Sequence, residues 1–182
     1  MPLLFPDTTV LINFVLMARV DLFAELVGSN GTWTYTIAQE SERKSAEPGL
    51  EGLQRMQGIL GIPLLPSPAE RIETIRLRAR IAKPNDHPHE HQGEAETIAI
   101  MSLRSINGAF VTDDLAAADL ARAPDLGLRV YTTGDLIRLA VRSSRIDLDT
   151  AWDLIEILRT HGRARGMPPI RSLLSQWVFG GL

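Results

Sequence analysis

Short apolar runs alternate with segments of helical periodicity along this sequence, and this alternation limits the fold more than any other feature. Three of the runs, residues 3–5, 108–111 and 128–131, have the length and composition of buried strands. Apolar residues recur at helical spacing over residues 10–15, 22–27, 68–82, 94–103, 115–121 and 133–141. Strands that are separated by helices are typical of a parallel sheet. We therefore expect an α/β fold built on a short parallel sheet.

Two more segments have strand-like patterns. Residues 33–37 alternate aromatic or apolar side chains with threonines, before a helix-favouring stretch that begins at Ala38. Residues 62–65 form a short apolar run between a glycine and a proline. We expect both segments to be strands. Residues 83–93 contain two prolines and no periodicity, which predicts a loop, and the chain beyond residue 145 is expected to be helical.

Five acids stand where this fold gathers side chains at one edge of the sheet: Asp7, Glu40, Glu94, Asp113 and Asp114. All but Glu94 directly follow, or lie a few residues after, an expected strand. Ligands of open α/β sheets bind outside the carboxyl ends of the strands, so residues in these positions converge on one crevice. Glu94 opens the helix after the loop, from where its side chain can project toward the same edge. The sequence therefore predicts one acidic pocket.

An acidic pocket of this kind is expected to hold metal, because carboxylates brought close together repel one another unless a cation lies among them. Oxygen ligands and the absence of cysteine favour Mg²⁺ or Mn²⁺ over zinc or copper. Such an ion activates water for attack on phosphorus, and two ions about 4 Å apart can share the task, so one ion or two stays open. The hydroxyls of Thr9 and Thr112 are placed to orient neighbouring carboxylates. The expected metal ligands are Asp7, Glu94, Asp114 and Asp113.

The spacing of the acids limits which of them act together. Glu94 and Glu96 are two residues apart on an expected helix, so they point to different faces and only one is expected to reach the metal. Asp113 and Asp114 are adjacent at a helix start, where one can bind metal while the other caps backbone N–H groups. Either assignment stays open. For any single acid in such a position, helix capping is the commoner role.

The composition excludes several classes of protein. With no cysteine among 182 residues, neither a disulfide framework nor a thiolate zinc site is available. The apolar N-terminus has no basic segment and is interrupted by Pro6 and Asp7 well short of a membrane span, so we expect a cytoplasmic protein without a membrane partner. No G-x-G-x-x-G or phosphate-binding loop follows the first strand, which weakens a Rossmann-type phosphohydrolase or nucleotide-binding protein as an alternative.

Positive charge is concentrated near the C-terminus. The net charge is −3, yet residues 128–182 hold eight arginines against five acids. These arginines are either phosphate contacts for RNA or an ordinary solvated helix surface. They are Arg129, Arg138, Arg142, Arg145, Arg159, Arg163, Arg165 and Arg171.

The predicted loop contains three alternate histidines, His87, His89 and His91. Alternate side chains in an extended segment point to opposite sides, so three-way metal binding needs a bend. A solvated loop beside the pocket is our expectation, and a zinc site is the alternative.

Several blocks resemble those of PIN-domain proteins. LLFPDTTVLINF resembles the opening block, in which a hydrophobic strand delivers the first acid, here Asp7. TIAQESER resembles the second block and places its acid at Glu40. HQGEAETIAIM is similar to a Gly-Glu-x-Glu-Ala-Ile block and places the third acid at Glu94. FVTDDLAAADLA resembles a Thr-Asp-Asp block, whose pattern favours Asp114 while leaving Asp113 in the pocket.

These blocks occur in the family's order over residues 1–145, followed by LGLRVYTTGDLIRLA, which resembles a Leu-Gly-Leu-x-Val-x-Gly-Thr block. Thr133-Gly134 reverses the usual Gly-Thr order, and residues 146–182 match no block. The resemblance divides the chain into a PIN-like domain, 1–145, and a helical C-terminal extension, 146–182, packed on the same domain.

The resemblance implies a three-layer α/β/α sandwich around a short parallel sheet and Mg²⁺- or Mn²⁺-dependent hydrolysis of RNA phosphodiester bonds. It also implies a VapC-like role as the toxin of a toxin–antitoxin pair, with a homodimer and a small antitoxin protein as partners. The alternative is a catalytically silent PIN fold that binds nucleic acid or protein.

Overall fold

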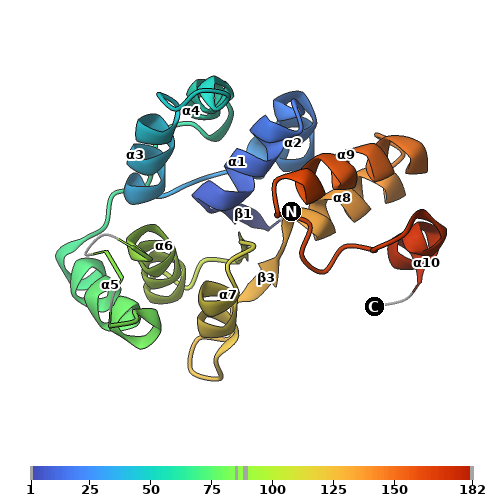
Figure 1. Cartoon of the computed structure of the whole chain (residues 1–182). Coiled ribbons are helices and arrows are strands. Elements are labelled where there is room, and N and C mark those ends of the chain that lie inside the picture. Colours follow the sequence, from blue (N-terminus) through green and yellow to red (C-terminus); the bar gives the residue numbers. More distant parts are fainter. Residues whose placement is uncertain (1, 85, 88–89, 181–182) are drawn as a thin grey trace.

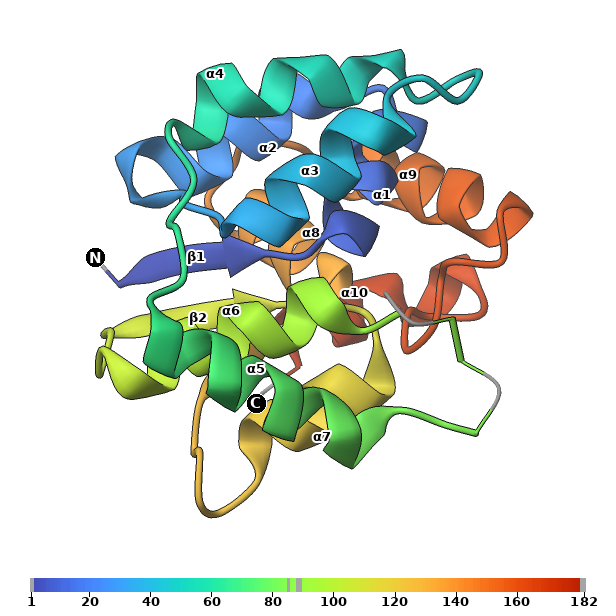
Figure 2. The ribbon, with the colours of Figure 1, turned by 90° about the vertical axis from the view of Figure 1, so that its left-hand side faces the viewer.

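The sheet is short, parallel and central. The computed structural model describes residues 2–84, 86–87 and 90–180. Its sheet has the strand order β1 (Leu3–Pro6), β2 (Gly108–Val111) and β3 (Arg129–Tyr131). Both pairs are parallel, as the sequence predicted, with Phe5 opposite Phe110 and Phe110 opposite Val130. The strands therefore share one carboxyl-terminal edge, which lies on the right in Figure 2.

Within the described residues, ten α-helices account for most of the chain. They are α1 (Thr8–Leu16), α2 (Val20–Val27), α3 (Tyr35–Lys44), α4 (Met56–Leu60), α5 (Pro68–Ile81), α6 (Gln92–Leu103), α7 (Leu115–Arg122), α8 (Thr133–Arg142), α9 (Leu148–Thr160) and α10 (Leu174–Phe179). Short 3-10 helices cover Gly28–Asn30, Glu51–Arg55 and Arg171–Leu173.

Helices cover both faces of the sheet because successive strand side chains point to opposite sides. Leu4 and Val111 belong to one hydrophobic cluster, which is otherwise built mainly from α1, α2, α3, α8 and α9. Phe5 and Phe110 belong to a second cluster with α5, α6 and α7. Figures 1 and 2 show these two groups of helices on either side of the strands. Burial on both faces explains why the strands read as continuous apolar runs.

The two additional strands predicted from the sequence are absent from the described residues. A single parallel bridge joins Thr34 to Leu64, and helix α3 already begins at Tyr35. The helix starts this early because the carboxylate of Glu96, on α6, accepts the backbone N–H of Thr36 at 2.8 Å. This N–H is one of those that a helix cannot satisfy within itself, and its partner comes from a distant part of the chain. The prediction of a strand from the alternating side chains of residues 33–37 was therefore wrong.

The C-terminal extension contributes to the first hydrophobic cluster. The buried residues of the extension in this cluster include Ile146, just before α9, Leu154 and Leu158 within α9, and Leu174 and Val178 of α10. Residues 83–91 of the predicted loop, so far as they are described, contain no helix or strand, and His89 lies outside the described residues. Residues 92 and 93, which were predicted to end the loop, already belong to α6. In the described part of the chain, no helix is both long and apolar enough to cross a membrane.

Candidate active site

Asp7 is a buried carboxylate held at the end of β1. It is the N-cap of α1, so its Oδ1 accepts the backbone N–H of Val10 at 2.9 Å, and the Thr9 hydroxyl donates to the same oxygen at 2.7 Å. The Thr112 hydroxyl, at the end of β2, donates to Oδ2. The contacts proposed for Thr9 and Thr112 are thus present. Burial nevertheless raises the pKa of Asp7 to about 7, with a smaller contribution from the charge of Asp113.

Glu94 lies in the first turn of α6 and is half-buried. Its pKa is raised to about 8, mainly by loss of water and to a smaller extent by the negative charges of Asp7, Glu40 and Asp114. These charges act on Glu94 only because the four acids lie near one another. Acids from four separate parts of the chain therefore converge, as the sequence predicted.

Glu40 lies near these acids, but in a different element from the one that the sequence predicted. It lies within α3 rather than at the end of a strand. The Thr8 hydroxyl donates to its Oε2 at 2.8 Å, and its pKa is raised mainly by burial. A Cβ at Gly93 would lie 3.2 Å from Oε2 and 2.5 Å from Ile37, so a residue without a side chain lets α6 and α3 approach here.

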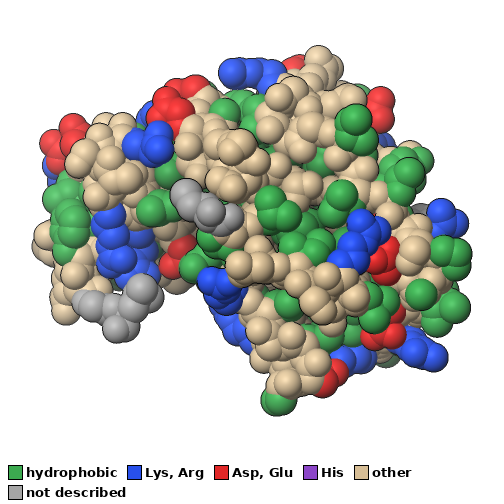
Figure 3. All heavy atoms as spheres, turned by 180° about the vertical axis from the view of Figure 1, so that it is seen from behind, with side chains coloured by type: hydrophobic (Ala, Val, Ile, Leu, Met, Phe, Trp, Pro, Cys, Tyr) green, Lys and Arg blue, Asp and Glu red, His purple; other side chains and the backbone are tan. Residues whose placement is uncertain are grey.

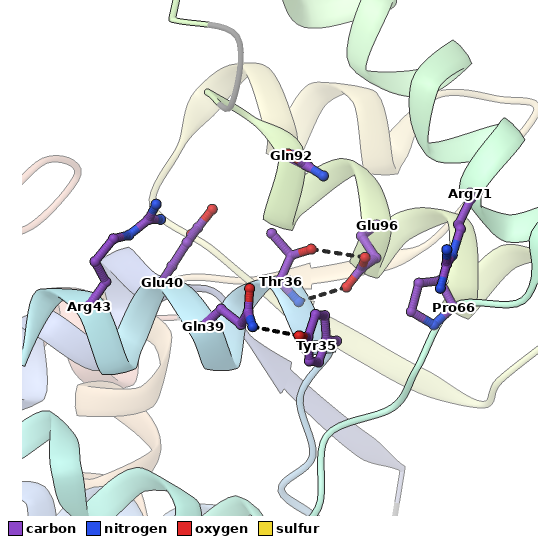
Figure 4. A pocket seen from close by; sticks show the side chains of 9 residues that line it. All are labelled: Tyr35, Thr36, Gln39, Glu40, Arg43, Pro66, Arg71, Gln92 and Glu96. Carbon is purple, nitrogen blue, oxygen red and sulfur yellow. Dashed lines mark hydrogen bonds between the residues drawn. The ribbon is translucent and has the colours of Figure 1, made fainter.

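Glu96 contacts Thr36, and its charge also raises the pKa of Glu40, so it lies beside the cluster. Its Oε1 accepts the Thr36 N–H and its Oε2 accepts the Thr36 hydroxyl at 2.9 Å. Both oxygens are thus used to fix the start of α3. Figure 4 shows this contact between the two helices.

Asp113 and Asp114 both accept helix-terminal N–H groups. Asp114 is the N-cap of α7, and its Oδ1 accepts the Ala117 N–H at 2.7 Å. The Oδ1 of Asp113 accepts the Thr133 N–H at 2.9 Å, in the first turn of α8. The expectation that only one of them caps a helix was too narrow. Asp113 lies near Asp7, and Asp114 lies near Glu94.

Sequence reasoning missed Asn13, which joins the acids to the C-terminal extension. This buried side chain donates to Asp113 Oδ2 at 2.7 Å and to the Thr133 hydroxyl at 3.0 Å. Its own Oδ1 accepts from Arg163 at 3.1 Å. The sequence does show Asn13 as a single amide within the apolar run of α1. A polar side chain in such a position needs hydrogen-bond partners when it is buried, and this could have marked it as part of a site.

The donor atoms are spaced more widely than in a closed metal cage. In the part of the chain that the structure describes, only Asp86, Glu90 and His91 place three possible ligand atoms within 4.8 Å of one another. No three of the five acids do so. Mg²⁺ commonly binds through one or two carboxylates and keeps several waters, so an open set of oxygens from the buried Asp7 and four half-buried acids still fits such an ion. Mutual repulsion between these carboxylates would be relieved by a cation among them.

The group at Asp86, Glu90 and His91 belongs to the loop before α6. His91 Nε2 lies 3.7 Å from Asp86 Oδ2, and His91 has a left-handed backbone, φ 61°. Arg78 holds this loop by donating to the Glu90 carbonyl at 2.8 Å. Exposed acidic groups are common without metal, and of the described histidines of this loop, His91 belongs to the group and His87 does not.

Two cavities border the acids. One, which we call the α3–α6 pocket, has a volume of about 470 Å³ and is shown in Figure 4. It is lined by Tyr35, Thr36, Gln39, Glu40, Arg43, Pro66, Arg71, Gln92 and Glu96. The other, which we call the α8–α10 pocket, measures about 250 Å³. It is lined by Asp113, Leu115, Thr132, Gly134, Asp135, Arg138, Arg163, Arg165, Gly166 and Trp177.

Comparison of the chain with protein-family models, with curated proteins and with solved structures finds no match.

Proposed function

We propose that this protein is a metal-dependent endoribonuclease that hydrolyses phosphodiester bonds in RNA. The observation that carries the proposal is the convergence of half-buried acids on the buried Asp7, where loss of water and mutual repulsion both disfavour the charged carboxylates of Asp7 and Glu94. Burying acids against one another destabilises a fold unless something compensates. A divalent cation provides that compensation, and nucleases use cations held in this way.

The residues of the site divide naturally into ligands and supports. Asp7, Glu94, Asp114 and Asp113 would hold Mg²⁺ or Mn²⁺, which supplies an activated water and stabilises charge on the phosphate oxygens. The hydroxyls of Thr9 and Thr112 fix the orientation of the Asp7 carboxylate. Glu40, held by the Thr8 hydroxyl, contributes negative charge at the side of the site that faces the α3–α6 pocket.

The arrangement supports the PIN-like interpretation of the sequence. Helices cover both faces of the parallel sheet, in keeping with a three-layer α/β/α sandwich, and the acids of the four blocks lie near one another. On this interpretation, residues 1–145 form the PIN-like domain and 146–182 an extension of it. A cytoplasmic toxin silenced by a small antitoxin protein is the biological role that we propose.

A homodimer is part of the same proposal. A groove of about 480 Å³ between β1, β3 and α8 is lined largely by apolar side chains, among them Leu26, Tyr131 and Leu139. Hydrophobic side chains also gather in the middle of the face seen from behind in Figure 3. Exposed apolar surface of this kind is typical of protein contacts.

One observation favours a second candidate, a PIN-like fold that binds nucleic acid or protein without cleaving it. No three of the five acids bring their oxygens within 4.8 Å of one another, so a tightly bound ion requires their side chains to move. A binding module would keep the acids as helix caps, which Asp7 and Asp114 already are.

The two candidates are separated by incubating the purified protein with structured RNA in Mn²⁺, with and without EDTA. We expect cleavage that EDTA abolishes and that Asp7→Asn abolishes, because asparagine keeps the helix cap and loses the charge. Asp147→Asn is the matched control, since Asp147 caps α9 in the same way at an exposed position. Undiminished cleavage by Asp7→Asn would overturn the proposal, and no cleavage by the wild type would favour the binding module.

A further inference from the structure

The acids form a row that leads from one cavity to the other. Glu40 lines the α3–α6 pocket and acts electrostatically on Glu94, Glu94 is close to Asp7, and Asp7 is close to Asp113. Asp113 in turn lines the α8–α10 pocket. Figure 1 shows α3, α5 and α6 on the left and α8 and α10 on the right, with α1 between them. The two pockets therefore flank the acids on opposite sides.

The α3–α6 pocket is lined by two arginines, one of which has no acidic partner among the described residues. Arg43 extends from α3 beside Glu40 and lowers the pKa of that carboxyl, while Arg71 enters from α5 (Figure 4). Within the described residues, the Arg71 side chain has no ion pair or hydrogen bond. Among the described residues, the second acid that lines this pocket is Glu96, whose two oxygens accept hydrogen bonds from Thr36.

The α8–α10 pocket has the same character, with cations supplied by the C-terminal extension. Three guanidinium groups face two carboxylates, Asp113 and Asp135. Arg138 lies 3.4 Å from Asp135 and stacks over the Trp177 ring at 5.5 Å, and Arg163 is held by the neutral amide of Asn13. Arg165 is exposed and, in the described part of the chain, has no partner. Its charge is available to a ligand.

We propose that a single strand of RNA crosses the acidic row, with one backbone phosphate bound in the α3–α6 pocket by Arg71 and another in the α8–α10 pocket by Arg165. This inference rests on the proposed function and deepens it. Buried acids alone would repel a polyanion, and cations on both sides place phosphates around them without neutralising the acids themselves. The extension at 146–182 thereby acquires a role in holding substrate.

The test is a binding titration in EDTA, where no metal supports cleavage, with a fluorescent single-stranded oligoribonucleotide of about 16 nucleotides. We compare the wild type with Arg71→Gln, Arg165→Gln and the double variant. Arg55→Gln is the matched control, because Arg55 is equally exposed and lines neither pocket. Thermal unfolding of each variant confirms that it is folded.

Each single variant is expected to bind about two- to five-fold more weakly, as for loss of one exposed charge contact. The double variant should show the product of the two losses, because the sites are far apart. The slope of log K against log salt should fall by about 0.7 for each phosphate contact removed. Wild-type affinity in both single variants, losses equal to that of Arg55→Gln, or no binding by the wild type would overturn the inference.

Cleavage in Mn²⁺ is measured separately, so the two proposals fail in different ways. Binding that depends on both arginines without any cleavage supports the RNA path and contradicts the nuclease. Cleavage whose KM is the same in the wild type and the double variant supports the nuclease and contradicts the path.

Discussion

Asp7 is the residue on which the site depends most, because it is both a structural cap and a buried charge. Two hydroxyls and one backbone N–H donate to its carboxylate, and yet burial still raises its pKa to about 7. Favourable contacts at this position therefore do not offset the loss of water. A side chain kept at such a cost is expected to serve function, which is the general pattern for acids with strongly shifted pKa values.

The raised pKa values of Asp7 and Glu94 predict an unusual pH dependence of stability in EDTA. Both acids bind protons more tightly in the folded protein than in the unfolded chain, where they titrate near 4. The folded state is therefore favoured at low pH, and this stability is lost progressively as pH rises from about 4 to about 8. We expect Tm to fall by at least about 3 °C between pH 5 and pH 8, because one pKa unit corresponds to about 1.4 kcal/mol.

Thermal unfolding monitored by circular dichroism measures this trend, and the double variant Asp7→Asn/Glu94→Gln should show a flatter profile. The window avoids Glu70, whose pKa is lowered to about 2 by Arg104 and whose contribution is lost only at more acidic pH. A Tm that rises from pH 5 to pH 8 in the wild type would contradict this account of the site.

At the residue level, the sequence predicted the acids and the two hydroxyls that contact Asp7, but it did not predict the role of Asn13. Asp7, Asp113 and Asp114 follow strands whose apolar runs are unmistakable, so their convergence could be inferred. Asn13 could not be given a role, because its partners, Asp113 and Arg163, are joined to it only by the folded arrangement of α1, β2 and the segment after α9.

At the scale of elements, the contact between α3 and α6 positions two of the acids. Gly93 permits this contact, because the space that a Cβ would occupy is taken by Ile37 and by the Glu40 carboxylate. The glycine before Glu94 is thus explained by packing between helices rather than by a turn, since Gly93 lies inside α6.

Gly93→Ala is therefore expected to destabilise the protein by about 1–3 kcal/mol, the usual range for overpacking, although alanine favours helix over glycine. Gly58→Ala in α4 is the matched control, because a Cβ there would meet nothing within 4 Å. The control should gain up to about 1 kcal/mol. Urea unfolding of the two variants measures the difference, and a stabilised Gly93→Ala protein would show that the two helices are not closely packed.

Prediction of elements succeeded where local pattern and tertiary structure agree. Strands β1, β2 and β3 and helix α5 follow directly from apolar runs and periodicity, and α5 has the Ser67–Glu70 capping box that such a start requires. The start of α3 failed because its support is Glu96 from another helix, which no local pattern reveals. The threonines that alternate with Trp33 and Ile37 favoured a strand, where the structure has the start of a helix.

At the scale of the whole molecule, the C-terminal extension is part of the core. Leu154, Leu158 and Val178 are buried in the same cluster as α1 and α8. A chain that ends at Arg145 should lose this burial and fail to give a cooperatively folding protein, because each buried leucine or valine contributes about 1.5–3 kcal/mol. Circular dichroism and gel filtration of the truncated chain test this, and a monomer with a sharp thermal transition would contradict it.

Calorimetric titration with Mn²⁺ decides whether the acids around Asp7 and Glu94 form a metal site. The wild type should bind the ion, Glu94→Gln should lose most of that binding, and Glu90→Gln should retain it. Glu90 belongs to the loop group with Asp86 and His91, which is the competing location for metal. Loss of binding in Glu90→Gln with retention in Glu94→Gln would move the metal to the loop and contradict the account.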